Sequence, residues 1–309
     1  MPMFEFPITI IILGKDGQVG FELSRSLQPL GNVIALGRTN IHYDLSGDIT
    51  DTNALRALFR LRPSIIVNAA AYTAVDNAEH EPHLADAVNA TAVANLASLC
   101  QEFGVLLIHY STDYVFDGTG TTPFSENDPT NPINRYGASK RLGETALECS
   151  GASFINLRTS WVYGVHGHNF IKTMLKLGSR PALNVVNDQI GSPTGARLIA
   201  DVTAQIIAQY LAHQDDSLCG HYHLSASGTC SWYDYAQFIF ATAKAYGQHY
   251  PVALTPIASI DYPTPAKRPL NSRLNCNKLQ QTFHLYLPHW QIGVAQVIGE
   301  PVSYTHLRA

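Results

Sequence analysis

The sequence is poor in charge and has no long apolar run, and each scarcity excludes a class of protein. Only 14% of the 309 residues are charged and the formal net charge is -4, so no basic surface is available for nucleic acid or for an anionic membrane. The apolar run at 8–13, ITIIIL, is too short to span a bilayer and lacks the flanks of a signal peptide. We therefore expect neither a nucleic-acid partner nor a membrane.

Cysteine is also scarce. The five cysteines lie far apart, at positions 100, 149, 219, 230 and 276, without the short spacing of a zinc or redox motif. Histidine pairs such as His166 and His168 fit a loop better than a metal site. We therefore predict no metal ligands, and a reducing, cytoplasmic setting.

What the sequence does contain is a regular alternation of apolar strands and amphipathic helices over its first half. Strands that are apolar throughout and separated by helices are typical of a parallel sheet covered on both faces. The pattern predicts the α/β class, with a Rossmann-type doubly wound parallel sheet. The expected strands span 8–13, 32–37, 64–71, 105–112 and 153–164.

This rhythm ends near residue 163, where loops rich in glycine and proline begin. Helices are expected near 196–213 and 231–246. We predict a smaller, irregular C-terminal substrate domain after the sheet. The predicted division is a dinucleotide-binding domain at 7–162, to which a segment near 194–225 returns, a substrate domain at 163–300, and a tail at 301–309 that one interpretation treats as not native.

Glycines 14, 17 and 20 follow the first expected strand directly and open a helical pattern. Gly14 permits a tight turn, Gly17 lets the backbone approach a diphosphate, and Gly20 lets the helix pack closely. The helix N-terminus then offers free N–H groups and a partial positive charge to phosphates. The position of this turn in the alternating chain favours dinucleotide binding over a plain turn.

The end of the second expected strand carries Arg38, where an acidic residue would repel a 2′-phosphate. A cation there suits that phosphate and favours NADPH, with NADH as the second possibility. The alternative is that Arg38 stacks on adenine or is only solvated. Further along, Asp48 and Ile49 follow a strand-like segment, where the carboxylate would bond the adenine amino group; the alternative is a helix cap.

Tyr136 and Lys140 stand one helical turn apart in "RYGASKRLGE", so they share a helix face. Thr112 lies 24 residues earlier, at the carboxyl end of an expected strand, which is where ligands collect in such sheets. A solvent-exposed helix start with an ordinary lysine remains the alternative for the pair taken alone.

With the glycine turn, these three residues make the chain resemble the extended short-chain dehydrogenase/reductase family. Within that family it is most similar to reductases of dTDP-linked 4-keto sugars. The resemblance extends from about residue 8 to 245, with two further segments at 268–275 and 287–294. The motifs that carry it are "GKDGQVG", "VNAAAYTAVDNAE", "YSTDYVFDG", "YGASK", "RTSWVYG", "GHNFIKTML", "NDQIGSPTGA" and "SWYDYA".

The resemblance implies an NADPH-dependent oxidoreductase that reduces the C4 keto group of dTDP-4-dehydro-L-rhamnose to give dTDP-L-rhamnose. Two alternatives stay open: a reductase or epimerase for another nucleotide-linked sugar, and a non-catalytic regulatory relative with the same fold. A monomer and a homodimer are both compatible with the sequence.

The implied catalytic residues are Thr112, Tyr136 and Lys140. Tyr136 would protonate the developing alkoxide, but free tyrosine has a pKa near 10, too high for efficient proton exchange at neutral pH. An ammonium one turn away would lower it. By resemblance Lys140 would also hold the nicotinamide ribose, and Thr112 would hydrogen-bond the substrate oxygen.

The resemblance also implies the binding residues. Asn89 matches a helix asparagine that orients the active-site lysine through water in the wider family. The cofactor would contact Gly14, Gly17, Gln18, Val19, Gly20, Arg38, Asp48, Ile49, Ala71, Tyr72, Tyr136 and Lys140. The substrate would contact Thr112, Asp113, Trp161, Asn169 and Arg268, with Arg273 as a further polar contact.

One departure from the family pattern concerns magnesium. Many bacterial members read "TGAELLAD" where this chain reads "TGARLIAD", so Arg197 stands in place of a carboxylate. In some relatives that carboxylate helps to bind magnesium at a dimer interface. The change makes a magnesium site doubtful in this chain, and dimerisation through it as well.

Overall fold

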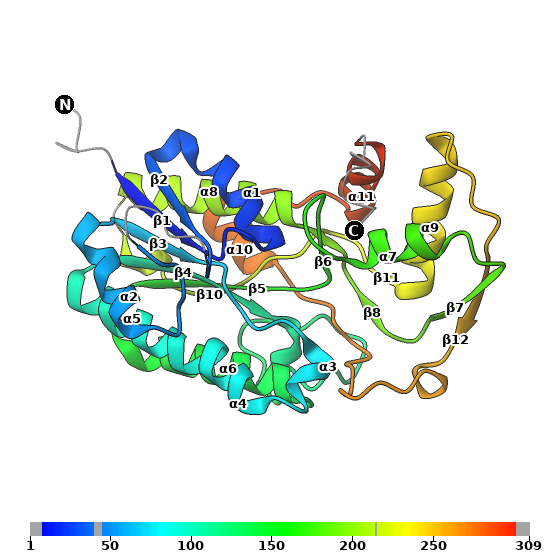
Figure 1. Ribbon diagram of the computed structural model, residues 1–309, viewed down its shortest axis with the longest axis horizontal. Helices are drawn as coiled ribbons and strands as arrows, with labels where there is room; N and C mark the ends of the chain where they lie inside the picture. The colour runs from blue at the N-terminus through cyan, green and yellow to red at the C-terminus, as the bar shows by residue number, and fades with distance from the viewer. Residues whose placement is uncertain (1–7, 40–44, 214, 301–309) are drawn as a thin grey trace.

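The computed structural model describes residues 8–39, 45–213 and 215–300. Residue 7 and the predicted tail at 301–309 lie outside these ranges. The described chain forms a sheet covered by helices, followed by a second, smaller set of helices and short strands beside the carboxyl ends of the sheet (Figure 1). No helix among the described residues has the length and apolar character needed to cross a membrane.

The sheet has six strands in the order β10-β5-β4-β3-β1-β2, and every neighbouring pair is parallel. The predicted class, a doubly wound parallel sheet, is confirmed. The strands are β1 (Thr9–Leu13), β2 (Asn32–Leu36), β3 (Ile65–Asn68), β4 (Leu106–Thr112), β5 (Phe154–Thr159) and β10 (Gly220–His223).

Both faces of the sheet are buried, which is why residues 10–13 of β1 are all apolar. Ile10 and Ile12 of β1 pack into one core, whereas Ile11 and Leu13 pack into another. The first core lies under α1 (Gln18–Ser26), α8 (Ala196–His213) and α10 (Asn277–Phe283). The second lies under α2 (Thr52–Leu58), α5 (Ala92–Phe103) and α6 (Arg135–Ser150), on the opposite side in Figure 1. Two short helices, α3 (Val75–Ala78) and α4 (Pro82–Asp86), lead into α5 through a π-helical turn at Ala87–Thr91.

The remaining segments surround a third core, which contains Tyr163, Tyr235 and Trp290. The chain leaves this part to form α8, which covers the first core, and β10, which joins the sheet, and then returns to it. The elements of this part are β6 (Val162–Tyr163), α7 (Phe170–Leu177), β7 (Ala182–Val186), β8 (Ile190–Gly191), β9 (Thr194–Gly195), β11 (Cys230–Ser231), α9 (Trp232–Ala245), β12 (Ala253–Ile257) and α11 (Trp290–Gly299).

The expected single strand at 153–164 is wrong in one respect. It divides into β5 and β6 at Trp161, whose φ is 47°. This left-handed conformation is strained for a bulky side chain and interrupts any strand. The break turns the chain from the sheet into the second part of the molecule.

Candidate active site

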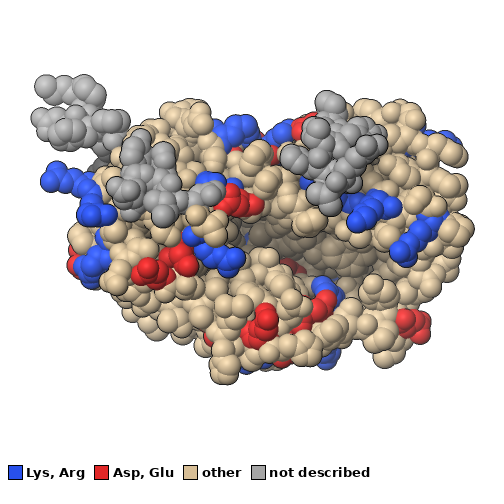
Figure 2. Space-filling model, in the orientation of Figure 1, with Lys and Arg blue, Asp and Glu red and all other residues tan. Residues whose placement is uncertain are grey.

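The carboxyl ends of the sheet strands face the second part of the molecule, and Figure 2 shows a hollow between the two parts. Gly14 follows β1, and Thr112 ends β4. Parallel strands gather their carboxyl ends at one edge, so residues far apart in sequence meet there.

The glycine turn has the geometry of a phosphate cradle. Gly14 has a φ of 85°, and a Cβ on it would lie 2.6 Å from the backbone nitrogen of Ala70. A Cβ on Gly20 would lie 2.1 Å from the Gly14 carbonyl oxygen, so the helix can pack on the turn only without a side chain. Gly17 differs, because a Cβ there would meet only the Gly14 oxygen at 3.4 Å. It therefore leaves its outer side open to a ligand.

The first turn of α1 follows this cradle. Its N-cap is Gly17, and no side chain caps the helix. The N–H groups of Gln18 and Val19 therefore lie in the uncapped first turn, available to an anion. The Gln18 side chain accepts a hydrogen bond from Asn169 (3.0 Å) and donates one to the Val162 carbonyl (3.4 Å). The sequence assigned Asn169 to the substrate, but the structure places it against a predicted cofactor residue, where it also caps α7.

The end of β2 leaves Arg38 exposed two residues after the strand, near the glycine turn. Asp48 holds a local turn, since its Oδ1 accepts from the backbone N–H and the hydroxyl of Thr50. The helix cap that was its alternative role belongs to Asp51. Ile49 is 4% exposed and packs in the second core, so its side chain is not available to a cofactor.

Asn89 fixes the segment after β3. Its Oδ1 accepts from the Tyr72 backbone N–H, and its Nδ2 donates to the Tyr72 carbonyl and to the Ser139 hydroxyl. The partly buried Ala71 and Tyr72 are thereby tied to the helix that carries Tyr136. Asn89 lies in the π-helical turn, a distortion that is frequent at functional sites.

Tyr136 and Thr112 are brought together as the sequence suggested. Burial raises the pKa of Tyr136 above its ordinary value and a hydrogen bond with Thr112 opposes the shift, whereas Asp113 and Tyr114 add to it. The Tyr136 ring makes an edge contact with Tyr114 at 5.7 Å. In this structure the pKa of Tyr136 is therefore raised, not lowered as expected.

Lys140 does not offset the effect of burial on Tyr136, because its amine is bonded to β4. Its Nζ donates to the Tyr110 carbonyl at 2.7 Å and lies 3.3 Å from Nε2 of His109. The side chain is 2% exposed, and burial lowers its pKa to about 8, with Glu144 opposing. Lys140 thus lies against two residues of β4, neither of which was predicted from the sequence as a site residue.

Asp113 is a buried carboxyl group beside the Thr112 hydroxyl. It is 3% exposed, and burial raises its pKa to about 7, with the hydroxyls of Ser272 and Thr112 opposing. Thr112 donates to Oδ1 at 3.1 Å, but Oδ2 has no hydrogen-bond partner among the described residues. A polar ligand group can satisfy this oxygen.

Trp161 stacks on Trp232, with ring centroids 3.6 Å apart. Gly191 permits this position, because a Cβ there would lie 2.6 Å from the Trp161 ring. The strained backbone and the stacked ring hold Trp161 in one orientation. Both indole rings remain partly exposed.

Arg268 joins the second part of the chain to the site. Its guanidinium pairs with Asp76 at 2.7 Å and lies 3.5 Å from the Tyr114 hydroxyl. Arg273 instead donates to the Asn271 side chain at 3.0 Å. The structure therefore brings Arg268 next to the Tyr114–Tyr136 pair, whereas Arg273 is engaged in its own loop.

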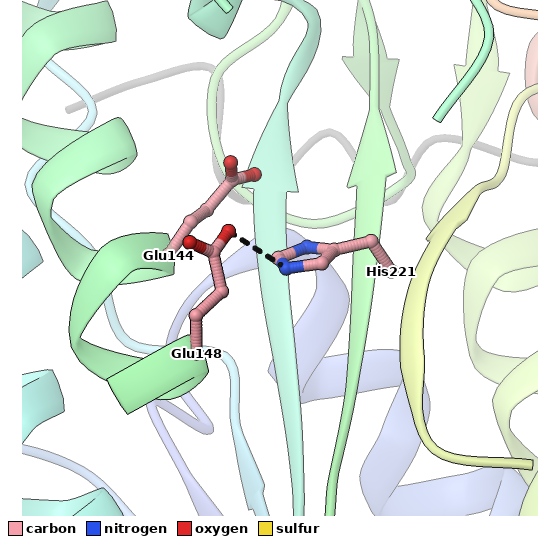
Figure 3. Close-up of side chains that lie close together, drawn as sticks. All are labelled: Glu144, Glu148 and His221. Carbon is pink, nitrogen blue, oxygen red and sulfur yellow. Dashed lines mark ion pairs between the residues drawn. The ribbon is translucent and has the colours of Figure 1, made fainter. Parts of the chain in front are cut away.

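Three side chains within the described residues have the proximity of metal ligands: Glu144 and Glu148 on α6, and His221 on β10 (Figure 3). Arg158 occupies both oxygens of Glu144 at 2.8 Å, and Arg141 pairs with Glu148 at 2.8 Å. A cation would have to compete with two guanidinium groups. The cluster is therefore better described as an ion-pair network.

Arg197 lies where the family pattern places a carboxylate, and it is also engaged in ion pairs. Its guanidinium is 2.6 Å from Glu300 and 3.7 Å from Glu22. These carboxylates are thus neutralised by a side chain. The surrounding cavity, about 310 Å³ between α8 and α11, does not include Thr112, Tyr136 or Lys140.

Residues from other elements also contact the site, and they were not predicted from the sequence. His109 and Asn68 occupy strands and read as core positions, while Asp76 and Trp232 sit in segments without a chemical motif. The one signal available was polarity, because His109 interrupts the otherwise apolar "VLLIHYST". A buried polar residue in such a strand requires a partner.

The sheet, the glycine turn and the Thr112–Tyr136 pair define a short-chain dehydrogenase/reductase with a Rossmann-type fold, a class of NAD(P)-dependent oxidoreductases. Within that class, the chain belongs to the family described as RmlD substrate binding domain, whose model matches residues 8–302.

Individual relatives agree with this family. The chain is 50% identical to dTDP-4-dehydrorhamnose reductase of Escherichia coli (strain K12) over 304 residues, which is 96% of this chain and 99% of the relative. A crystal structure of dTDP-4-dehydrorhamnose reductase from Bacillus anthracis in complex with NADP superposes with a TM-score of 0.83 at 35% identity, covering 94% of this chain and 98% of that one. UDP-glucose 4-epimerase of Thermus thermophilus, in complex with NAD, shares the fold at a TM-score of 0.74 and 20% identity, covering 94% and 98% of the two chains.

Proposed function

We propose that this protein reduces the C4 keto group of dTDP-4-dehydro-L-rhamnose to give dTDP-L-rhamnose, with NADPH as the reductant. The observation that carries the proposal is the meeting of Thr112 and Tyr136 at the carboxyl end of β4, beside a glycine cradle. The relatives named dTDP-4-dehydrorhamnose reductase, one of them solved with NADP, support the choice of substrate and cofactor.

The residues present fit a dinucleotide. The open side of Gly17 and the uncapped N–H groups of Gln18 and Val19 would hold the diphosphate. Exposed Arg38 would bind the 2′-phosphate. The segment at Ala71 and Tyr72, tied down by Asn89, would line the nicotinamide side, and Asp48 with the Ile49 backbone would lie near adenine. When bound, NADPH supplies the hydride that reduces the C4 carbonyl carbon.

The protein's own contribution is a proton and a fixed set of hydrogen bonds. Tyr136 gives its phenolic proton to the C4 oxygen, which becomes a hydroxyl. Thr112 hydrogen-bonds the same oxygen and stabilises the charge that develops on it. Burial keeps the Tyr136 phenol protonated at neutral pH, so the proton is available before the reaction begins.

The substrate would lie across the hollow between the two parts of the molecule. The free Oδ2 of Asp113 would accept from a sugar hydroxyl, and Trp161 would form a wall of the site. Arg268 would pair with the dTDP diphosphate, since a guanidinium matches phosphate oxygens. Asn169 would act through Gln18 on the cofactor side.

We further propose that the chain divides into a cofactor domain and a substrate domain. Residues 7–162 with a returning segment near 194–225 would form the cofactor domain, and the rest of 163–300 the substrate domain. The support is that β10 joins the sheet and α8 packs in the core on one of its faces, although both follow α7 and β7 in sequence. The five cysteines are free, which supports a cytoplasmic setting. For the oligomeric state, we propose a monomer or a homodimer.

The decisive experiment is turnover of the purified protein with NADPH and dTDP-4-dehydro-L-rhamnose, compared with Tyr136→Phe. The variant should lose activity by about 10² to 10⁴-fold while NADPH binding survives, because only the proton donor is removed. Tyr114→Phe is the matched control, with a neighbouring ring that gives no proton to the substrate. Absence of turnover in the wild type with this and other dTDP-keto-sugars would favour the regulatory alternative. Turnover only with tightly bound NAD would favour an epimerase.

The glycine cradle offers a separate test of cofactor binding. Gly17→Ala should fold normally, because its Cβ meets only one atom at 3.4 Å, but it should weaken NADPH binding about tenfold or more. Gly20→Ala places a Cβ 2.1 Å from the Gly14 oxygen and should lower the free energy of unfolding instead. Fluorescence titration and urea unfolding separate the two effects. Equal NADPH affinity in Gly17→Ala and wild type would contradict the cradle.

A further inference from the structure

Three buried polar side chains form a row beneath the site. Asn68 ends β3, His109 lies on β4 and Lys140 on α6, and each is 1–2% exposed. Nδ2 of Asn68 is 3.2 Å from Nδ1 of His109, and Nζ of Lys140 is 3.3 Å from Nε2 of the same ring. His109 therefore lies between an amide and an amine, and the positions of the protons in the row follow from its partners.

The orientation of the Asn68 amide is set by the backbone. The N–H of Ala70 donates to Oδ1 of Asn68 at 3.2 Å, so the NH₂ group is the one that faces His109. An NH₂ group only donates, and Nδ1 must accept. A neutral imidazole carries one proton, which is then on Nε2.

This proton points at Lys140. An ammonium has three donors and no lone pair, so it would set a donor against the Nε2–H. A neutral amine accepts from Nε2–H with its lone pair and still donates to the Tyr110 carbonyl at 2.7 Å. Only the neutral amine satisfies both contacts.

We propose that Asn68 fixes His109 as the Nε2–H tautomer, that this N–H favours the neutral amine of Lys140 over its ammonium, and that a bound dinucleotide reverses this preference, so that binding is coupled to protonation of the amine. His109 is in this sense a positioning residue that acts through Lys140. The tautomer and the neutral amine stand on the contacts alone, whereas the proton uptake rests on the proposed function.

The surrounding charges agree with this arrangement. Burial lowers the pKa of His109 well below its ordinary value, and positive charge on Lys140 or His221 lowers it further, so the ring stays neutral whether Lys140 is an amine or an ammonium. Glu144 is the carboxylate whose charge raises the pKa of Lys140, so it favours the ammonium form. Both oxygens of Glu144 are engaged by Arg158, which weakens that influence.

Proton uptake changes what Lys140 can contact. Once the amine gains a proton from solvent it loses the lone pair that accepted from His109. The resulting ammonium has three N–H donors and is released to hold hydroxyl oxygens, such as those of a ribose. Asn68, His109 and Lys140 thereby couple the charge of Lys140 to the binding of a ligand whose hydroxyl oxygens accept hydrogen bonds.

The first test is nuclear magnetic resonance of the protein labelled with ¹⁵N-histidine, without NADPH. The His109 signals, assigned by their loss in His109→Gln, should show a protonated Nε2 and an unprotonated Nδ1 from pH 6 to 9. A protonated Nδ1, or a charged ring at pH 7, would overturn the proposal. The ¹³Cε signal of Lys140, assigned with Lys140→Met, should titrate near pH 8; a midpoint near 10.5 would also overturn it.

The second test is NADPH affinity against pH. If the ammonium binds the cofactor and the amine titrates near pH 8, the wild-type Kd should rise about tenfold between pH 7 and pH 9, because only about a tenth of the protein is then competent. In His109→Gln the amide oxygen can accept from the ammonium, so most of this rise should disappear. His223→Gln is the matched control, because His223 is a buried sheet histidine that contacts Arg158 and Phe124 rather than Lys140.

A second variant, Asn68→Asp, tests the same proposal if His109→Gln does not fold. Asn68→Asp keeps the acceptor for Ala70 and offers His109 a carboxylate, which accepts from Nδ1–H and leaves Nε2 free to accept from the ammonium. The tautomer should switch and the Lys140 midpoint should rise. If NADPH fails to bind at every pH the proposed function fails, but the resonance experiments still decide the tautomer. If His109 has the expected tautomer but the Kd for NADPH does not change between pH 7 and pH 9, the proposed proton uptake is wrong.

Discussion

Helix α6 carries two buried ionisable side chains one turn apart that are treated in opposite ways. Glu144 is 0% exposed and meets a guanidinium at both oxygens, whereas Lys140 is 2% exposed and, within the described part of the chain, forms no ion pair. Burial by itself would raise the pKa of Glu144, but Arg158 reverses the shift and lowers it. Burial lowers the pKa of Lys140 to about 8.

The difference separates a structural group from a reactive one. A buried charge with a bidentate partner stays charged and ties α6 to β5. A buried amine with neutral partners can exchange its proton near neutral pH, which is what a site for proton transfer and cofactor binding requires. Glu144 lies against Arg158 of β5, and Lys140 lies against His109 and Tyr110 of β4.

The largest expected effect is on the structural side of this comparison. Glu144→Gln leaves Arg158 buried without its carboxylate, and the free energy of unfolding should fall by about 3–5 kcal/mol. Urea unfolding at pH 7 measures it. A loss below 1 kcal/mol would show that Arg158 finds another partner, and the contrast with Lys140 would then fail.

Lys140→Met should act in the opposite direction on stability. The wild-type lysine must lose solvation on folding, so its removal should raise the free energy of unfolding at pH 7 by about 1–3 kcal/mol while activity falls. The folded pKa is lowered from 10.5 to about 8, so the unfolded chain binds more protons in this window and wild-type stability rises as pH increases from 8 to 10.5.

In Lys140→Met that rise should be missing, and the difference between variant and wild type should shrink towards pH 10.5. Chemical unfolding of both proteins at pH 7, 8, 9 and 10 measures the trend. A gap that stays constant across this range would mean that Lys140 keeps its ordinary pKa in the folded protein.

The smallest effect is expected at the outer end of the same network. Glu148 is 37% exposed and pairs with Arg141, which is 27% exposed. Glu148→Gln should change the free energy of unfolding by less than about 1 kcal/mol, and added salt should reduce the change further. A loss as large as that of Glu144→Gln would show that the three-residue cluster acts as one unit.

Particular residues show how far the sequence could predict the site. Thr112 and Tyr136 were found because a strand end and a helix start place chemistry at fixed positions. The Tyr-x-x-x-Lys spacing correctly put Lys140 on the same helix, but it could not show that the amine lies against His109. That contact depends on which β4 residue faces α6, and the sequence offered only one polar interruption as a clue.

The substrate side was harder to predict for a related reason. Trp161 was expected within a continuous strand, yet its backbone is left-handed and its ring stacks on Trp232, 71 residues later. Asn169 was predicted to contact the substrate, and its amide bonds Gln18 across 151 residues, a contact that the sequence did not suggest. Contacts over such separations have no local signature.

The sequence by itself determined the alternation of strands and helices, the glycine cradle and the order of Thr112, Tyr136 and Lys140. Local periodicity and the stereochemistry of glycine act within a few residues, so they can be read from the chain directly. The tertiary structure alone decided which buried charge is paired and which proton is shared. Those outcomes depend on solvation and on hydrogen-bond partners that distant segments supply.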